Sequence, residues 1–215
     1  MAGKIGKRIG IVGIATIVGT IIAVLALIFT YINLKIEPFL PEKKEKKEEQ
    51  VSTPALPLPV NVTNDISFFP SGWMGDGEAG KKYISFTRSM EDIKIAYTPG
   101  PKGWAGIYWQ FPDGNWGRLA GRNLTGAQKL TFWAKGETGK EMVEFKAGGI
   151  RDQQYKDSFE KSLGKVKLTQ TWQQYQIDLA GEDLSNVIGA FTWIASNDFN
   201  PEGVTFYLKD IYFEK

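Results

Sequence analysis

The pattern of apolar and polar residues divides the chain into three parts. Residues 9–34 contain no charged side chain, residues 35–60 are rich in proline and charge, and residues 61–215 contain short runs in which apolar and polar side chains alternate. Alternation with a period of two is typical of strands that bury one face. We therefore expect one membrane helix, one stalk and one β domain.

The uncharged run is long enough to cross a membrane. A helix needs roughly 20 apolar residues to span the hydrocarbon layer, and residues 9–34 exceed that length. Lys4, Lys7 and Arg8 lie in residues 1–8, and the positive-inside rule places such a basic end in the cytoplasm. The sequence therefore predicts a single-pass protein of the cell membrane, with transmembrane residues 9–34 in contact with the lipid bilayer and an extracytoplasmic C-terminal domain.

Two alternatives to an uncleaved signal anchor fit the uncharged run less well. The apolar region of a cleaved signal peptide is shorter, roughly 7–15 residues, and ends at a small-residue site, whereas this run passes through Phe29-Thr30-Tyr31. A pilin-type leader would be cleaved near Arg8-Ile9-Gly10, but the glutamate expected shortly afterwards is missing.

Residues 35–60 have the composition of a disordered, extended stalk. They contain five prolines and the mixed-charge run from Glu42 to Glu49. Such a segment has too few apolar residues to bury a core, and its prolines stiffen it. We expect it to hold the domain of residues 61–215 away from the bilayer.

The alternating segments predict nine short strands in the C-terminal part. Turn residues separate them, which favours two packed antiparallel sheets, an all-β sandwich. The expected strands are 82–88, 93–97, 105–111, 129–134, 142–147, 165–169, 173–179, 187–195 and 205–213. The clearest core positions are Leu130, Phe132, Ala134, Tyr175, Ile177 and Leu179. Residues 187–195 and 205–213 have apolar side chains on both faces, so we expect a bulge or two-sided burial there.

Composition excludes several kinds of chemistry. The chain has no cysteine and no histidine, so disulfides, the usual zinc sites and Ser-His-Asp or Cys-His catalysis are absent. Its net charge is only +2, which does not favour a nucleic-acid partner. Glycoside hydrolysis requires two carboxylates on either side of a cleft, and Glu141 and Glu144 fall on opposite faces of one strand. We therefore expect no enzymatic activity.

Three segments carry a resemblance to a known superfamily: Leu130–Gly136, which follows a Leu-Thr-Gly-Ala turn, then Trp172–Leu179, and finally Phe206–Ile211. They resemble the jelly-roll β-sandwiches of the galactose-binding-like superfamily, which includes many carbohydrate-binding modules. The resemblance implies a jelly roll that binds a carbohydrate or glycoconjugate without catalysis. Lys209 departs from the pattern, because many such modules have there the first of two aspartates that often belong to a structural calcium site.

Aromatic side chains beside planar polar groups are the expected carbohydrate contacts, because a flat ring covers the CH face of a sugar. Trp73 and Trp116 lie among glycines and are expected as exposed platforms, although tryptophans that close the ends of the sandwich are the alternative. The loop of residues 147–159 is expected either to fold over a ligand or to be solvated. The candidate ligand-binding residues are Trp73, Asp76, Trp104, Tyr108, Asn115, Trp116, Arg118, Tyr155 and Asp157.

A structural calcium ion is the one cofactor that the sequence suggests. Calcium takes several oxygen ligands, and Asp76, Glu78 and Asp210 would supply them if the ends of the domain meet. Ordinary surface carboxylates are the alternative.

Together these patterns predict a membrane-anchored, cell-surface carbohydrate-binding module. The alternative is a structural or assembly subunit of the cell envelope, or a pilin-like surface protein, whose β-sandwich docks another envelope protein through its exposed tryptophans.

Overall fold

The computed structural model describes residues 23–31, 53–63 and 67–215. The chain separates into two units, Met1–Val51 and Ser52–Lys215. In the first unit, residues 23–31 form a helix with exposed side chains. No helix in the described ranges has the length and apolar character needed to span a membrane. The predicted span of residues 9–34 lies mostly outside those ranges.

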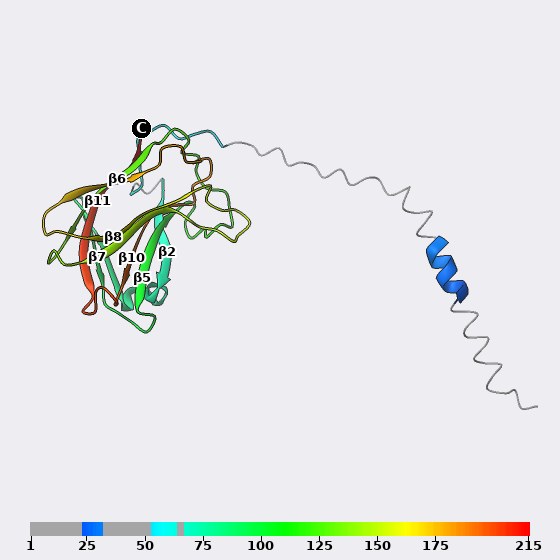
Figure 1. The fold of residues 1–215 in the computed structure, drawn as a ribbon, viewed down its shortest axis with the longest axis horizontal. Helices are drawn as coiled ribbons and strands as arrows, with labels where there is room; N and C mark the ends of the chain where they lie inside the picture. The colour runs from blue at the N-terminus through cyan, green and yellow to red at the C-terminus, as the bar shows by residue number, and fades with distance from the viewer. Residues whose placement is uncertain (1–22, 32–52, 64–66) are drawn as a thin grey trace, which may run out of the picture. The chain divides into compact units, whose positions relative to one another are not determined.

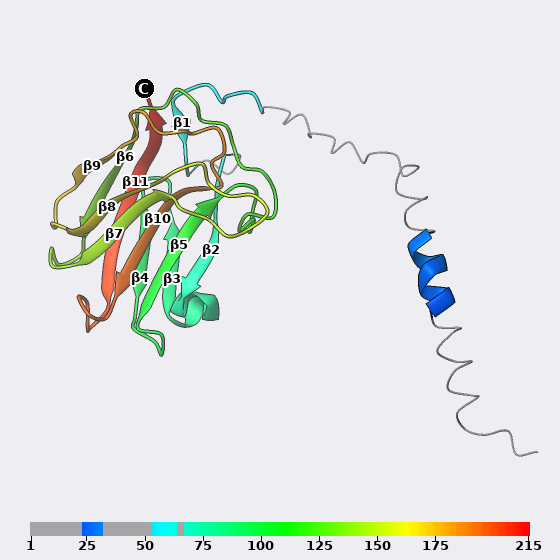
Figure 2. The ribbon, with the colours of Figure 1, turned by 45° about the vertical axis from the view of Figure 1, so that its right-hand side comes forward.

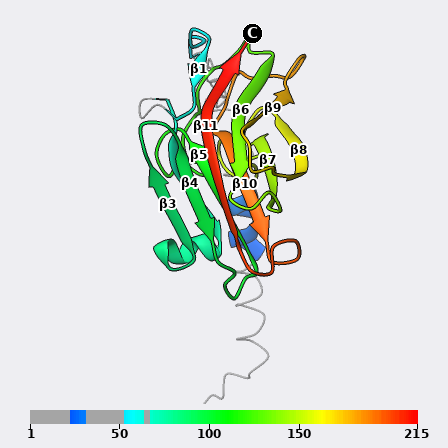
Figure 3. The same cartoon turned by 90° about the vertical axis from the view of Figure 1, so that its left-hand side faces the viewer.

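The second unit is a sandwich of two antiparallel sheets, which confirms the predicted all-β class. Sheet A has the order β3-β4-β11-β6-β9, and β1 adds to β11. Sheet B has the order β2-β5-β10-β7-β8. Figures 1 and 2 show the two layers, and in Figure 3 sheet A faces the viewer, with β11 between β4 and β6. Sheet A is built from β1 (Val60–Asn61), β3 (Ile84–Arg88), β4 (Ile93–Tyr97), β6 (Lys129–Gly136), β9 (Gln173–Asp178) and β11 (Val204–Glu214). Sheet B is built from β2 (Phe69–Gly75), β5 (Trp104–Gln110), β7 (Met142–Gly148), β8 (Glu160–Lys167) and β10 (Gly189–Ser196).

Strand β2 was not expected from the sequence. It contains Pro70 and Gly72, which normally indicate a turn. The strand is tolerated because β2 lies at the edge of sheet B, where a proline without an N–H donor costs no ladder hydrogen bond. A short 3-10 segment, η2 (Asp76–Lys82), follows it directly.

The core lies between the sheets and follows the predicted alternation. Leu130, Phe132 and Ala134 of β6 are fully buried, as are Ile177 and Leu179, whereas Tyr175 is partly buried against them. The register of β11 shifts between Lys209 and Tyr212, and that of β10 shifts near Gly189. These irregularities confirm the expected bulges. In β11 the bulge lets both Leu208 and Ile211 face the core.

The folded domain begins earlier than the sequence suggested. Leu56 and Leu58 pack against the core, and Val60 is buried in β1. Leu56 N–H also donates to the Asn123 carbonyl at 2.8 Å. The last residues assigned to the stalk therefore belong to the domain, because every second one is apolar and covers the end of the sandwich.

Candidate functional site on sheet B

The outer face of sheet B is built from side chains that pair across neighbouring strands. Tyr108 of β5 pairs with Thr192 of β10, which pairs with Lys146 of β7, and Lys146 pairs with Ser162 of β8. Residues paired across antiparallel strands point to the same face. These four side chains therefore form one row on the face that points away from the core.

The neighbouring rung is flatter. It runs from Gly106 through Ile194 and Glu144 to Lys165. A Cβ on Gly106 would lie 2.8 Å from the end of Met74 and 2.6 Å from the Trp193 carbonyl oxygen. This close approach requires glycine at position 106.

Tyr108 lies beneath Trp116 and is held in place by burial and a hydrogen bond. Its ring is only 7% exposed, and its hydroxyl donates to the Gly148 carbonyl at 3.0 Å. Gly189 makes room for the ring, since a Cβ there would lie 2.9 Å from it. The Tyr108 ring meets the Trp116 ring edge to face, with centroids 6.1 Å apart. Trp116 therefore has a rigid support beneath it.

The loop of residues 111–119 presents Trp116 to solvent. Trp116 is 36% exposed and has φ 48°, a left-handed conformation that is uncommon for a bulky residue. Asn115 is buried and holds the loop closed: its Nδ2 donates to the carbonyls of Phe111 (2.9 Å) and Leu119 (2.8 Å). Strained backbone that the surrounding contacts enforce is concentrated at functional sites. Asn115 thus supports the platform and does not face a ligand.

A second loop, residues 149–158, lies against the first. Tyr155 N–H donates to the Gly117 carbonyl at 2.9 Å, and Tyr155 is 37% exposed. Asp157 is buried, and its carboxylate accepts from the N–H groups of Ile150 (2.8 Å), Ile188 (2.5 Å) and Gly189 (3.1 Å). Asp157 therefore ties this loop to the start of β10 and has no free edge for a ligand.

The charges around Tyr108 are paired. Glu160 accepts from Lys146 Nζ at 2.6 Å and from Arg151 Nε at 3.3 Å, and the Lys146 hydrogen bond holds the pKa of Glu160 below its ordinary value. Burial raises the pKa of Tyr108, and the negative charges of Asp157, Glu160 and Glu144 raise it further. Lys146 and Glu160 both lie at the surface, so the face offers a hydrogen-bond donor and an acceptor side by side.

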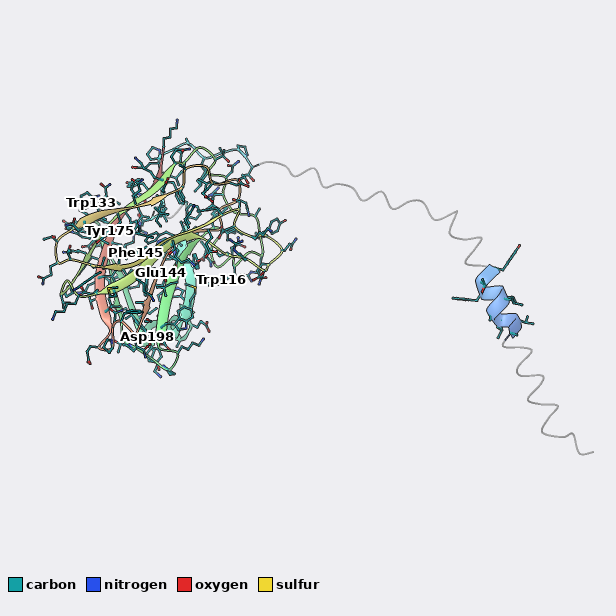
Figure 4. All side chains as sticks on the ribbon, in the orientation of Figure 1. Trp116, Trp133, Glu144, Phe145, Tyr175 and Asp198 are labelled. Atoms are coloured by element: carbon teal, nitrogen blue, oxygen red, sulfur yellow. The ribbon has the colours of Figure 1, made fainter. Side chains whose placement is uncertain are left out.

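Trp104 adds a third exposed ring, after Trp116 and Tyr155. It lies at the start of β5 and is 38% exposed. Tyr108 is four residues farther along the strand, so the two are separated by roughly 14 Å at the usual rise. Gly106 and Ile194 lie between them. Figure 4 shows Trp116 beyond β5 and Glu144 on β7, over the same sheet.

Trp73 and Arg118 do not have the places that the sequence suggested. Trp73 lies in β2 and faces the interior, where it packs against the core and meets Phe86 with ring centroids 6.3 Å apart. The expectation of an exposed loop platform at Trp73 is therefore corrected. The alternation of β2 turns Met74 outwards instead. Arg118 is exposed, but its guanidinium donates within its own loop, to the carbonyls of Asn115 (3.2 Å) and Gly114 (2.5 Å).

The structure does not bring the expected calcium ligands together. Asp76 is buried and accepts from Tyr97 Oη, Gly100 N–H and Lys102 N–H, each at 2.8 Å. Tyr97 pairs with Val204, and Asp210 lies six residues farther along β11, so roughly 20 Å separates the two carboxylates at the usual strand rise.

Glu78 is exposed and pairs with Lys102 Nζ at 2.8 Å. Within the described residues, no group of three or more acidic side chains is arranged to hold a metal ion. The ligand set of Asp76, Glu78 and Asp210 is therefore not assembled.

The polar residues of β7 and β8 that complete the face were not predicted as site residues from the sequence. Glu144 and Lys146 alternate with the buried Val143, Phe145 and Ala147. This alternation marks them as outward-facing. It does not reveal that β7 lies beside β10 and hence near Tyr108, because that depends on strand order.

Similarity to known proteins is found among solved structures. No family model matches the chain, and no curated protein matches it. Among solved structures, the family 11 carbohydrate-binding module from Clostridium thermocellum, in complex with a β-1,3-1,4-mixed-linked tetrasaccharide, is 14% identical over 73% of this chain and 94% of that chain, with a TM-score of 0.48. A family 30 carbohydrate-binding module is 16% identical over 73% of this chain and 98% of that chain, with a TM-score of 0.48. These values are too low to indicate which residues of this chain bind a ligand.

Proposed function

We propose that the outer face of sheet B binds a carbohydrate chain. The observation that carries this proposal is the exposed indole of Trp116, held at φ 48° against the buried ring of Tyr108. An aromatic ring that is rigidly supported and solvent-facing covers the CH face of a sugar with little loss of side-chain entropy.

The surroundings of Trp116 fit a neutral sugar chain. Tyr155 adds a second exposed ring from the adjacent loop, and Trp104 adds a third at the other end of β5. Beside them, on β8 and β7, Glu160 and Lys146 present an acceptor and a donor that already balance each other's charge. Sugar hydroxyls both donate and accept hydrogen bonds, so such paired groups suit them without requiring a charged ligand.

The face supports binding without catalysis. Hydrolysis of a glycosidic bond needs one carboxyl group that can protonate the leaving oxygen and a second that acts opposite it. Asp157 is buried under three backbone N–H groups, and Glu160 is engaged by Lys146 and Arg151. Glu144 accepts from Ser162 Oγ at 3.0 Å. This pattern favours a binding role for the face.

The same proposal includes a location at the cell surface. The uncharged residues 9–34 and the basic residues before them favour a membrane anchor with the β domain outside. Protease added to intact cells should then cut the charged segment between Glu42 and Glu49. Full protection of that segment, with cleavage only after lysis, would contradict the orientation.

Binding is tested by affinity electrophoresis of the full chain through gels that contain neutral soluble polysaccharides, such as mixed-linkage β-glucan, xyloglucan or mannan. Trp116→Ala should weaken retention about tenfold, because one stacking contact is worth about 1.4 kcal/mol. Leu119→Ala is the matched control, since Leu119 is an exposed apolar residue of the same loop. Its retention should stay unchanged.

Circular dichroism and a melting curve on both variants show whether the fold is intact. Equal retention of Trp116→Ala and the parent chain, with both folded, would refute this site. If the parent is retained by no polysaccharide, docking of another protein becomes the better explanation of the exposed rings.

A further inference from the structure

The outer face of sheet A carries a row of alternating rings and lysines. Lys94 Nζ lies 5.2 Å and Lys135 Nζ 4.7 Å from the centroid of the Tyr207 ring. Lys135 also lies 5.0 Å and Lys209 4.8 Å from the Trp172 ring. Each ring is thus flanked by two ammonium groups, and Lys135 is shared between the two rings. This row faces away from the core, on the side opposite to Trp116.

The register of the sheet produces the row. Tyr207 and Lys209 alternate with the buried Phe206 and Leu208 along β11. Tyr207 pairs with Lys94 on one side and with Lys135 on the other. Neighbouring strands are about 4.8 Å apart, so long lysine side chains on these positions reach the ring between them. Figure 3 shows β4, β11 and β6 side by side.

Among the ion pairs of the described residues, none joins a carboxylate to the three lysines at the centre of the face. The nearby lysine that is paired is Lys129, which lies 3.6 Å from Glu214 at the far end of β11. Glu137 accepts a hydrogen bond from Tyr207 Oη instead. The centre of the row is therefore a concentrated positive charge held in place by aromatic rings, on a chain whose net charge is only +2.

The row continues into a hollow at one end of the sheet. A cavity of about 510 Å³ is lined by residues that include Ala96, Thr205, Glu137, Thr138 and Asn200. Ala96 lies two residues from Lys94, and Thr205 two residues from Tyr207, so both are on the same face of sheet A. Small side chains at these positions lower the surface beside Tyr207, and polar groups line the hollow.

We propose that the outer face of sheet A is a second binding site, for a polysaccharide that carries carboxylate or sulfate groups. Lys94, Lys135 and Lys209 would pair with the anionic groups, and the hollow would hold an uncharged part of the chain. Glu137 at the hollow disfavours a polymer with a negative charge on every unit, such as a nucleic acid, because one of its charges would face this carboxylate. The site lies on the sheet opposite to the neutral-carbohydrate site proposed above and does not depend on it.

The test compares the full chain with the double variant Lys135→Gln and Lys209→Gln in affinity gels that contain hyaluronate or κ-carrageenan, polysaccharides in which charged and uncharged sugar units alternate. Exposed ion pairs contribute modestly, so the loss of two should weaken retention about tenfold. Retention of the parent chain should also fall with added salt. Lys82→Gln is the matched control, because Lys82 also lies over a tyrosine ring, 5.0 Å from the centroid of Tyr83, but on η2 and outside the row.

The outcomes separate the two sites. We expect the double variant to lose retention by acidic polysaccharides and to keep any retention by neutral ones, whereas Trp116→Ala should behave in the opposite way. The proposal is overturned if the parent chain is not retained by either acidic polymer. It is equally overturned if the retention of Lys82→Gln falls as much as that of the double variant, or if single-stranded DNA binds more tightly than hyaluronate.

Discussion

Replacement of Asp76 by asparagine tests whether this carboxylate is a structural acceptor or a calcium ligand. In the structure it is buried and accepts three hydrogen bonds of 2.8 Å, from Tyr97 Oη and from the N–H groups of Gly100 and Lys102. These bonds fix the segment that joins β4 to β5 against the start of η2. Asparagine has nearly the same shape, but its amide NH₂ group would face at least one of these donors.

The expected loss follows from this geometry. A hydrogen bond to a charged group contributes about 1.5–3 kcal/mol, and the amide loses one or two of the three. We expect Asp76→Asn to lower the free energy of unfolding by about 3 kcal/mol, which lowers the melting temperature by roughly 6–12 °C for a domain of this size. Glu78→Gln is the control, because its exposed pair with Lys102 should contribute less than about 1 kcal/mol.

The pH dependence of this loss has a definite sign. Burial by itself raises the pKa of Asp76, but the hydrogen bonds from Lys102, Tyr97 and Gly100 outweigh burial and hold the pKa below its ordinary value of 3.8. Because the pKa is lower in the folded state, the stabilisation is present above pH 3.8 and is lost as the pH falls through the folded-state pKa. The difference between parent and variant should therefore shrink in acid.

Urea unfolding at pH 7 and in acid, with and without chelator, measures each of these quantities. A calcium ligand would behave differently, since chelator would destabilise the parent as much as the substitution does. That result, or a loss below about 0.5 kcal/mol at pH 7, would refute the structural role of Asp76.

Two further predictions concern other residues of the domain. Burial raises the pKa of Asp157 to about 6, so its contribution to stability is fully present below pH 3.8 and is lost as the pH rises through about 6. In urea unfolding, the stability of the parent relative to Asp157→Asn should fall by about 2–3 kcal/mol across that window, and a constant difference would contradict the raised pKa. Trp73→Ala should lower the free energy of unfolding by about 2–4 kcal/mol, because Trp73 packs against the core, whereas Trp104→Ala should lower it by less than about 1 kcal/mol. Equal melting temperatures of the two variants would contradict the placement of Trp73 against the core.

The class of the fold and the core positions on β6 and around β9 could be predicted from the sequence alone. The alternation of Leu130, Phe132 and Ala134 is a local property of one strand, so it can be predicted without knowledge of the strand's neighbours. Apolar residues on both faces of β10 and β11 predicted either a bulge or two-sided burial, and the register shifts show a bulge in each strand. The absence of cysteine and histidine likewise excludes whole classes of site on composition alone, because the reactive or metal-binding side chains are missing.

Which residues come into contact depends on the tertiary structure. Trp73 and Trp116 both lie among glycines in the sequence, but the pairing of β2 with β5 turns Trp73 into the core, and the contact with Tyr108 holds Trp116 at the surface. Asp76 and Asp210 lie far apart because β11 runs the length of sheet A. The row of rings and lysines on sheet A depends on residues from three strands and from the approach to β9. Each of these outcomes is set by strand order and register, which arise from contacts between residues distant in the chain and leave no local pattern in the sequence.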